Sequence, residues 1–174
     1  MDEHQKGRTA SNMNMQEAAE RADRILDATF GAVTPEIQWA HDETTTGSCE
    51  VTRRRTVTTV ISQERRGNFL GVVERFWQRE GYTIKAVRRD LEMPAVYASS
   101  PDGFAIRLLF GYQGQAFFET VTPCVSESDV ADPVTKPNGP AYRGVPIPTP
   151  NVRSAFWSAE VPVGGTGRGE GGGG

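Results

Sequence analysis

A histidine next to two carboxylates is the one arrangement in this sequence that could support acid–base chemistry. His41 is followed directly by Asp42 and Glu43, and a neighbouring carboxylate can raise the pKa of an imidazole and orient its ring. Successive residues of a strand point to opposite faces, so only Glu43 shares a face with His41. The threonines and glycine that follow are typical of a strand that ends in a polar loop. We therefore expect a structural role for His41, with a hydrolase that uses it as the alternative.

The two cysteines predict a disulfide bond. Cys49 precedes a long predicted strand and Cys124 follows the last one, and strand ends of one sheet lie close together. A bridge between them would close a loop of about 75 residues and stabilise the fold by roughly 4.5 kcal/mol in the chain-entropy model. Such a bridge is expected outside the cytosol. Two free thiols, in a cytosolic protein, are the alternative.

Other catalytic or cofactor chemistry has little support. The two histidines and two cysteines are far apart and lack the spacing of a zinc site. The chain contains neither a Gly-x-Ser-x-Gly motif nor a glycine-rich phosphate loop that ends in Lys-Ser or Lys-Thr. We therefore expect no metal, no cofactor and no catalytic residue.

Basic residues gather in one segment of the chain. The segment from residue 50 to residue 90 contains ten Lys or Arg and five acidic residues, a net charge of +5, whereas the rest carries −8. Arg53, Arg54, Arg55 and Arg88 are therefore candidates for binding an anionic partner. A solvated face with scattered ion pairs is the alternative. The net charge of −3, and the lack of stacking aromatics among these arginines, argue against nucleic acid as the partner.

Periodicity predicts the elements that must position these residues. Apolar residues at helical spacing predict helices over residues 15–30 and 68–80, and Asn14 with Glu17 predicts a capping box at the first. β-branched or alternating residues predict strands over residues 37–41, 51–61, 82–89, 95–99, 104–110 and 116–122. The order α-β-β-α-β-β-β-β with short links predicts an α+β fold, a two-layer sandwich of a mostly antiparallel sheet with two helices on one face.

The strand over residues 51–61 decides where its arginines point. Val57 shares a face with Arg53 and Arg55, so that face should be the core side, with both arginines reaching solvent at its rim. Arg54 should then lie on the open face, beside an arginine of the strand over residues 82–89.

Uneven composition predicts the boundaries of the domain. The chain of 174 residues is long enough for one domain with a core, and we place that domain at residues 13–125. Residues 1–12 and the glycine-rich residues 164–174 are expected to be disordered. Residues 126–163 form a proline-rich extended arm, which should wrap along its own domain or, alternatively, dock on another protein. No apolar run is long enough to span a membrane.

Most of the chain resembles a known family. The sequence contains the stretches NMQEAAERADRILDATF, CEVTRRRTVTTVISQERRGNFLGVVERFW, PAVYASSPDGF, GQAFFETVTPC, KPNGPAY and NVRSAFWSAE. Over about residues 11–160, these resemble a family of actinobacterial lipoproteins of unassigned function. Members of that family carry an N-terminal lipoprotein signal with a lipidated cysteine, and no such signal precedes Met13 here. The resemblance implies an extracytoplasmic location, at the cell surface or secreted, and carries over no catalytic residue.

A non-catalytic module of the cell envelope, which binds an envelope component or a protein partner, is the function that these features favour. An enzyme of unrecognised type and a cytosolic interaction or immunity-type protein with reduced cysteines are the alternatives.

Overall fold

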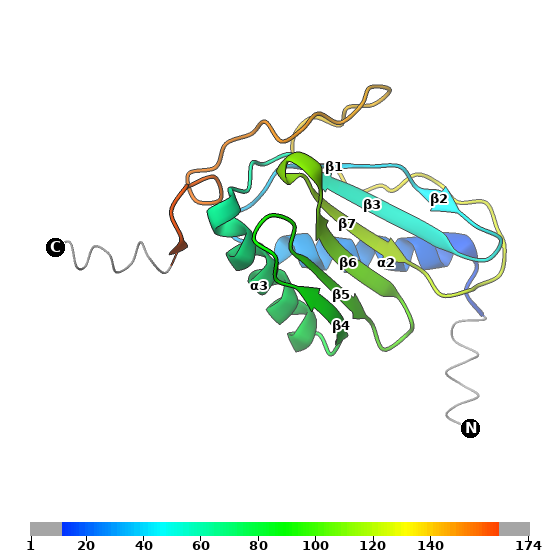
Figure 1. Ribbon diagram of the computed structural model, residues 1–174. Helices are drawn as coiled ribbons and strands as arrows, with labels where there is room; N and C mark the ends of the chain where they lie inside the picture. Colours follow the sequence, from blue (N-terminus) through cyan, green and yellow to red (C-terminus); the bar gives the residue numbers. More distant parts are fainter. Residues whose placement is uncertain (1–11, 164–174) are drawn as a thin grey trace.

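A seven-stranded antiparallel sheet forms one layer of the molecule and two helices form the other, in the computed structural model of this chain, which describes residues 12–163 (Figure 1). The elements are α2 (Met15–Gly31), β1 (Trp39–His41), β2 (Thr45–Thr46), β3 (Val51–Val57), α3 (Gln63–Arg79), β4 (Thr83–Arg88), β5 (Ala95–Ser99), β6 (Ala105–Phe110), the 3-10 turn η1 (Tyr112–Gly114) and β7 (Ala116–Val121). The strand order is β1-β3-β7-β6-β5-β4, and β2 also pairs with β3. The predicted α+β sandwich is confirmed, with the two-residue β2 as an addition. The disorder expected for residues 1–12 and 164–174 concerns segments outside the described residues, apart from Asn12.

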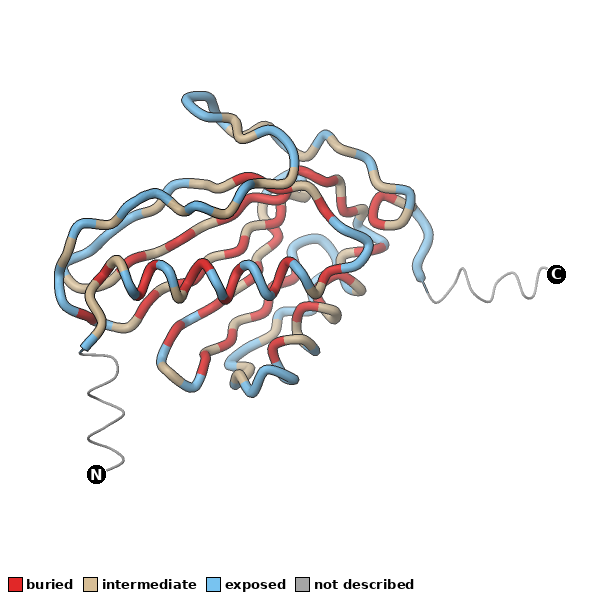
Figure 2. The backbone as a smooth tube through the Cα atoms, turned by 180° about the vertical axis from the view of Figure 1, so that it is seen from behind, coloured by how far each residue is buried: buried red, intermediate tan, exposed pale blue. Residues whose placement is uncertain are grey.

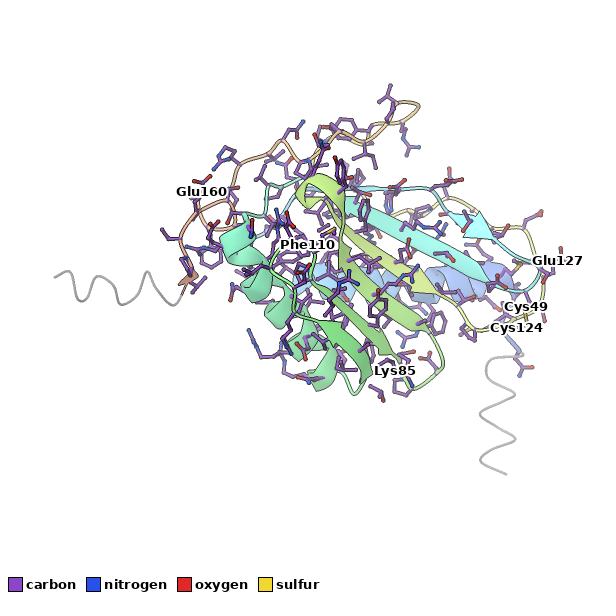
Figure 3. The ribbon with its side chains drawn as sticks, in the orientation of Figure 1. Cys49, Lys85, Phe110, Cys124, Glu127 and Glu160 are labelled. Atoms are coloured by element: carbon purple, nitrogen blue, oxygen red, sulfur yellow. A yellow bond between two sulfur atoms is a disulfide. The ribbon has the colours of Figure 1, made fainter. Side chains whose placement is uncertain are left out.

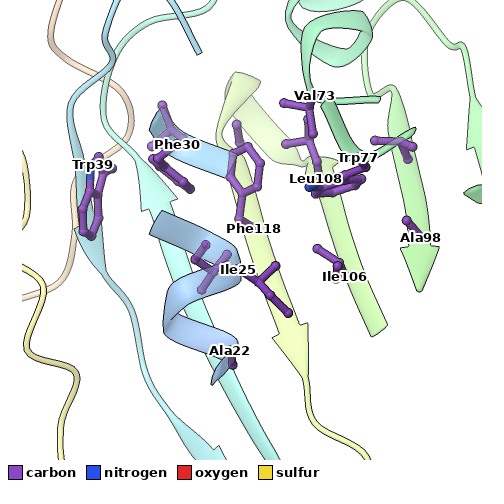
Figure 4. Packing of buried hydrophobic residues seen from close by; sticks show 14 of the residues in the cluster. Ala22, Ile25, Phe30, Trp39, Val73, Trp77, Ala98, Ile106, Leu108 and Phe118 are labelled. Carbon is purple, nitrogen blue, oxygen red and sulfur yellow. The ribbon is translucent and has the colours of Figure 1, made fainter. Parts of the chain in front are cut away.

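Helix α2 covers one half of the sheet. The Asn14 side chain accepts the Glu17 N–H, and the Glu17 side chain accepts the Asn14 N–H, so the predicted capping box is confirmed. Its buried face repeats at helical spacing and packs over β3 and β7. Phe30 packs on Phe118 of β7, with ring centres 4.6 Å apart (Figure 4).

Helix α3 covers the other half of the sheet and begins five residues before the predicted start at Asn68. Its first turn, which begins at Gln63, has no apolar stripe. This turn packs against the arm instead. Arg65 donates to the carbonyl of Val161 and lies 4.5 Å from the ring centre of Phe156. Contacts with a distant segment therefore extend the helix where its own sequence gives no periodic signal.

Strand β3 ends at Val57, four residues earlier than predicted. The chain then leaves the sheet and pairs with the arm instead: the Val60 N–H donates to the carbonyl of Val152, and the Val152 N–H donates to that of Thr58. The β-branched residues 58–61 therefore continue beyond the sheet strand, where the arm bonds the Thr58 carbonyl and the Val60 N–H.

The arm, residues 126–163, lies along its own domain. It runs beside β1, projects as a loop near residue 144, and returns to the start of α3 (Figures 1 and 2). Trp157 near its end is fully buried, packs edge-to-face on Phe69 at 5.1 Å, and donates its indole N–H to the carbonyl of Pro35. The arm therefore contributes to the core and wraps along its own domain, as the sequence predicted.

Cys49 and Cys124 form a disulfide bond, which confirms the predicted pairing (Figure 3). The bond joins the turn between β2 and β3 to the link between β7 and the arm, and it spans 75 residues of sequence. It thus fixes the arm at one end, while the buried Trp157 fixes it at the other. None of the helices within residues 12–163 is long and apolar enough to cross a membrane.

Candidate functional site

Arg53 and Arg55 lie between the sheet and α2, on the core face that the sequence predicted. Their exposed fractions are only 2% and 1%, so neither reaches solvent at a rim. Arg53 forms an ion pair with Asp23 at 3.0 Å, and Arg55 forms one with Asp27. The Arg55 guanidinium also lies 4.1 Å from the ring centre of Trp39, a cation–π contact. Both candidate arginines are therefore neutralised inside the fold, and neither is open to an external anion.

The arm covers both ion pairs at the edge of the sheet–helix interface. The carbonyl of Ala131 accepts a hydrogen bond from Arg53, and the Thr135 hydroxyl donates to Asp27. Burial raises the pKa of Asp23 above its ordinary value of 3.8, and the neighbouring Arg53 opposes that rise. The rim position expected for the arginines does not form because residues 131–135 occupy the space beyond their guanidinium groups.

Arg54 lies on the open face of the sheet, as expected from the alternation of β3. Its neighbour is not an arginine of β4 but Glu119 of β7, to which Arg54 Nε donates at 2.8 Å. Arg107 of β6 binds the same carboxylate from the other side. Burial alone would raise the pKa of Glu119, but the hydrogen bonds from Arg107 and Arg54 outweigh it, and that pKa lies below its ordinary value of 4.5.

Arg88 lies apart from the other three candidates. It is the last residue of β4, at the opposite edge of the sheet from β1, and donates to the carbonyl of Met93. The structure therefore places two of the four arginines at the sheet–helix interface, Arg54 on the open face of β3, and Arg88 at the far edge of the sheet. It does not bring them together as one patch.

His41 joins the arm to the sheet. Its Nε2 lies 2.7 Å from the carbonyl of Thr135, so this nitrogen carries the proton because a carbonyl can only accept. The ring packs edge-to-face on Trp39 at 4.9 Å. Burial lowers the pKa of His41 below its ordinary value of 6.5, and the Thr135 bond partly offsets that fall.

The Asp42 carboxylate beside His41 binds other groups. Asp42 accepts hydrogen bonds from the Thr56 hydroxyl at 2.7 Å and from the backbone N–H of Glu43 at 2.8 Å. Within residues 12–163, no carboxylate forms a hydrogen bond with the His41 ring. The contacts of His41 within the described part of the chain therefore link the arm to the sheet.

A cleft of about 850 Å³ opens where the arm stands away from the sheet edge. We call it the arm cleft, and it is lined by residues 41–44, 132–137, 139 and 141–144. Its volume lies in the range of small-ligand pockets, about 300–1,000 Å³. Exposed charged residues of both signs line it, none of them in an ion pair within the described part of the chain: Glu43, Asp132, Lys136 and Arg143.

The arm side of this cleft is a loop with unusual backbone geometry. Gly139 and Gly144 adopt positive φ values of 107° and 76°, and Tyr142 between them has a φ of 54°. A Cβ atom at Gly139 would lie 2.5 Å from the Gln38 side chain, so the loop needs glycine at this point. Sequence reasoning missed Asp132, Lys136 and Arg143 because they lie about 90 to 100 residues after His41 in a segment without periodicity.

The described residues contain no group of three or more His, Cys, Asp or Glu side chains that could hold a metal ion. No protein-family model matches the chain, and no match is found among curated proteins or solved structures.

Proposed function

We propose that this protein is a non-catalytic, extracytoplasmic module that binds a component of the cell envelope in the arm cleft. The observation that carries the proposal is the contrast between the charges of the cleft and those of the sheet. Arg53, Arg54 and Arg55 each pair with a carboxylate of the same chain. Lys136 and Arg143 are exposed at the cleft without such a pair, so they remain available to a ligand.

The walls of the arm cleft support a binding role. One wall belongs to the sheet edge, and the other is an arm held by the buried Trp157 and by the disulfide at Cys124. A site whose walls are fixed before binding loses less conformational entropy when a ligand enters. The cleft is therefore preorganised, although it is built from segments far apart in the sequence.

Two observations support the extracytoplasmic location. The disulfide between Cys49 and Cys124 is a bond that persists in oxidising compartments. The resemblance to actinobacterial lipoproteins implies the same location.

The test is retention of the full chain on isolated actinobacterial cell wall. The variant Lys136→Glu/Arg143→Glu reverses both cleft cations, and we expect its retention to fall on the order of tenfold at low salt. The control variant Arg24→Glu/Lys85→Glu makes the same change in net charge at exposed residues of α2 and β4, and its retention should match the unchanged protein. No retention of the unchanged protein, or equal loss in both variants, would contradict the proposal.

A further inference from the structure

The two edges of the sheet differ in how they are protected. The outer edge of β4 carries a bulge between Ile84 and Ala86 and the exposed cations Lys85 and Arg88, features that discourage pairing with another strand. The other edge, formed by β1 and β2, has the arm beside it instead (Figure 1). A covering segment blocks the backbone N–H and C=O groups of an edge strand only where it contacts them. Where the arm is separated from β1, these groups can still pair with another strand.

The register of β1 shows which backbone groups point away from the sheet. The Asp42 N–H donates to Arg54, and the Gln38 carbonyl accepts from Thr58. In an antiparallel pair only alternate residues bond the partner strand, so Trp39 and His41 direct their N–H and C=O groups outward. The Trp39 N–H donates to the carbonyl of Asn138.

Beyond Trp39, the arm does not continue this pairing. Within residues 12–163, the bridge between Trp39 and Asn138 is the only backbone pairing of β1 with the arm. The arm reaches His41 only through the side chain, whose Nε2 bonds the carbonyl of Thr135. The arm cleft begins at this point, since residues 41–44 form its sheet wall. His41 therefore lies in the wall of the cleft, and within residues 12–163 its backbone N–H and C=O, which point away from β3, have no backbone partner.

We infer that the arm cleft takes an extended peptide, which adds as a strand to the outer edge of β1 at His41. This inference rests on the proposed function and names the class of ligand. A strand edge offers a donor and an acceptor at the spacing of a polypeptide backbone, which only another extended peptide matches repeatedly. The exposed Glu43 and Asp132, with Lys136 and Arg143, suit a peptide with charged side chains of both signs.

The probe is a synthetic library of random decapeptides, screened against the full chain by fluorescence polarisation. The tightest binder is then resynthesised with one backbone N-methyl group at each position in turn. Methylation at alternate positions of the paired segment should weaken binding at least about tenfold, since every second N–H of a strand bonds its neighbour. Methylation at the positions between should have little effect. Exchange of the His41 amide proton, followed by NMR, should slow in the complex.

Three results would overturn the inference. They are the absence of any library peptide that binds tighter than about 1 mM, a methylation profile without alternation, and unchanged exchange at His41 in the complex. The cell-wall retention test is independent of these measurements. If retention still depends on Lys136 and Arg143, the cleft binds an envelope component by another mode, and only strand addition fails. If retention also fails, the proposed function fails with it.

Discussion

At the scale of single residues, the buried arginines matter more for the fold than for binding. Arg53 and Arg55 were candidates for an external anion, yet each faces an aspartate of α2. Two arginines on a strand are readily placed on one face by alternation, but the sequence does not reveal that Asp23 and Asp27, one helical turn apart, face them. The alternation of β3 was therefore predictable, and the charge pairing was not.

Substitution of Arg53 by leucine is predicted to destabilise the fold strongly. Arg53→Leu leaves the Asp23 carboxylate buried without its cation, which typically costs about 3–5 kcal/mol. The free energy of unfolding, measured in urea, should fall by that amount. Arg54→Leu, which removes a half-exposed cation from the same strand, is the matched control and should cost clearly less. Equal losses in the two variants would show that Arg53 is not held by a buried pair.

The titration of His41 predicts a pH dependence of stability. Burial lowers its pKa below 6.5 in the folded state, so below about pH 6.5 the unfolded chain binds a proton that the folded chain does not. Stability from this group is therefore full above that pH and is lost as the pH falls towards the lower folded pKa. Arg55 and Arg53 lower the pKa further, while Asp27 opposes them.

His41→Gln removes the titration but keeps a donor for the Thr135 carbonyl. Between about pH 7.5 and about pH 5.5, the unfolding free energy of the variant should therefore fall less than that of the unchanged protein. Urea unfolding at several pH values measures both slopes. Parallel slopes would mean that His41 does not titrate differently in the folded and unfolded states.

At the scale of elements, the sequence predicted the features that depend on residues close together in the chain. The capping box at Asn14 and the apolar stripe of α2 are visible in the sequence because both depend on residues within one or two turns. The start of α3 and the end of β3 were misplaced because the arm decides both. Its contacts with Arg65 and with residues 58–61 join segments about 90 to 100 residues apart, a separation that periodicity cannot register.

Trp157 is predicted to be a main anchor of the arm. Trp157→Ala removes a fully buried side chain that packs on Phe69, and such truncations cost about 3–5 kcal/mol. Thermal and urea unfolding should both show this loss. The exposed Tyr112 gives the matched control, and Tyr112→Ala should change stability by less than about 0.5 kcal/mol. A stability loss as small as that of the control would mean that the arm is dispensable for the core.

At the scale of the whole molecule, the disulfide between Cys49 and Cys124 is predicted to stabilise the fold. Cys49→Ser is predicted to lower the free energy of unfolding by about 2–5 kcal/mol, because the bridge closes a long loop of the unfolded chain. The double variant Cys49→Ser/Cys124→Ser should show the same loss, which separates the lost bond from any effect of one free thiol. An unfolding midpoint unchanged in both variants would contradict a stabilising role for the bond.

The fold could be predicted from the sequence to a larger extent than the arm cleft could. Two helical stripes, alternating strands and two border cysteines were sufficient for the α+β sandwich and its disulfide. The arm cleft has one wall at residues 41–44 and the other in the arm, in a segment without periodicity. Its position depends on how far the arm stands from β1, and tertiary contacts such as those at Thr135 and Asn138 determine that distance.

Hydrogen–deuterium exchange of the full chain, with and without solubilised actinobacterial cell wall, tests the central claim most directly. Binding in the arm cleft predicts slower exchange in the two segments that form its walls, residues 41–44 and 132–144. Strands β5 (Ala95–Ser99) and β6 (Ala105–Phe110), which do not line the cleft, should exchange at unchanged rates. Protection confined to these two strands, or no protection anywhere in the chain, would contradict the assignment of the arm cleft as the binding site.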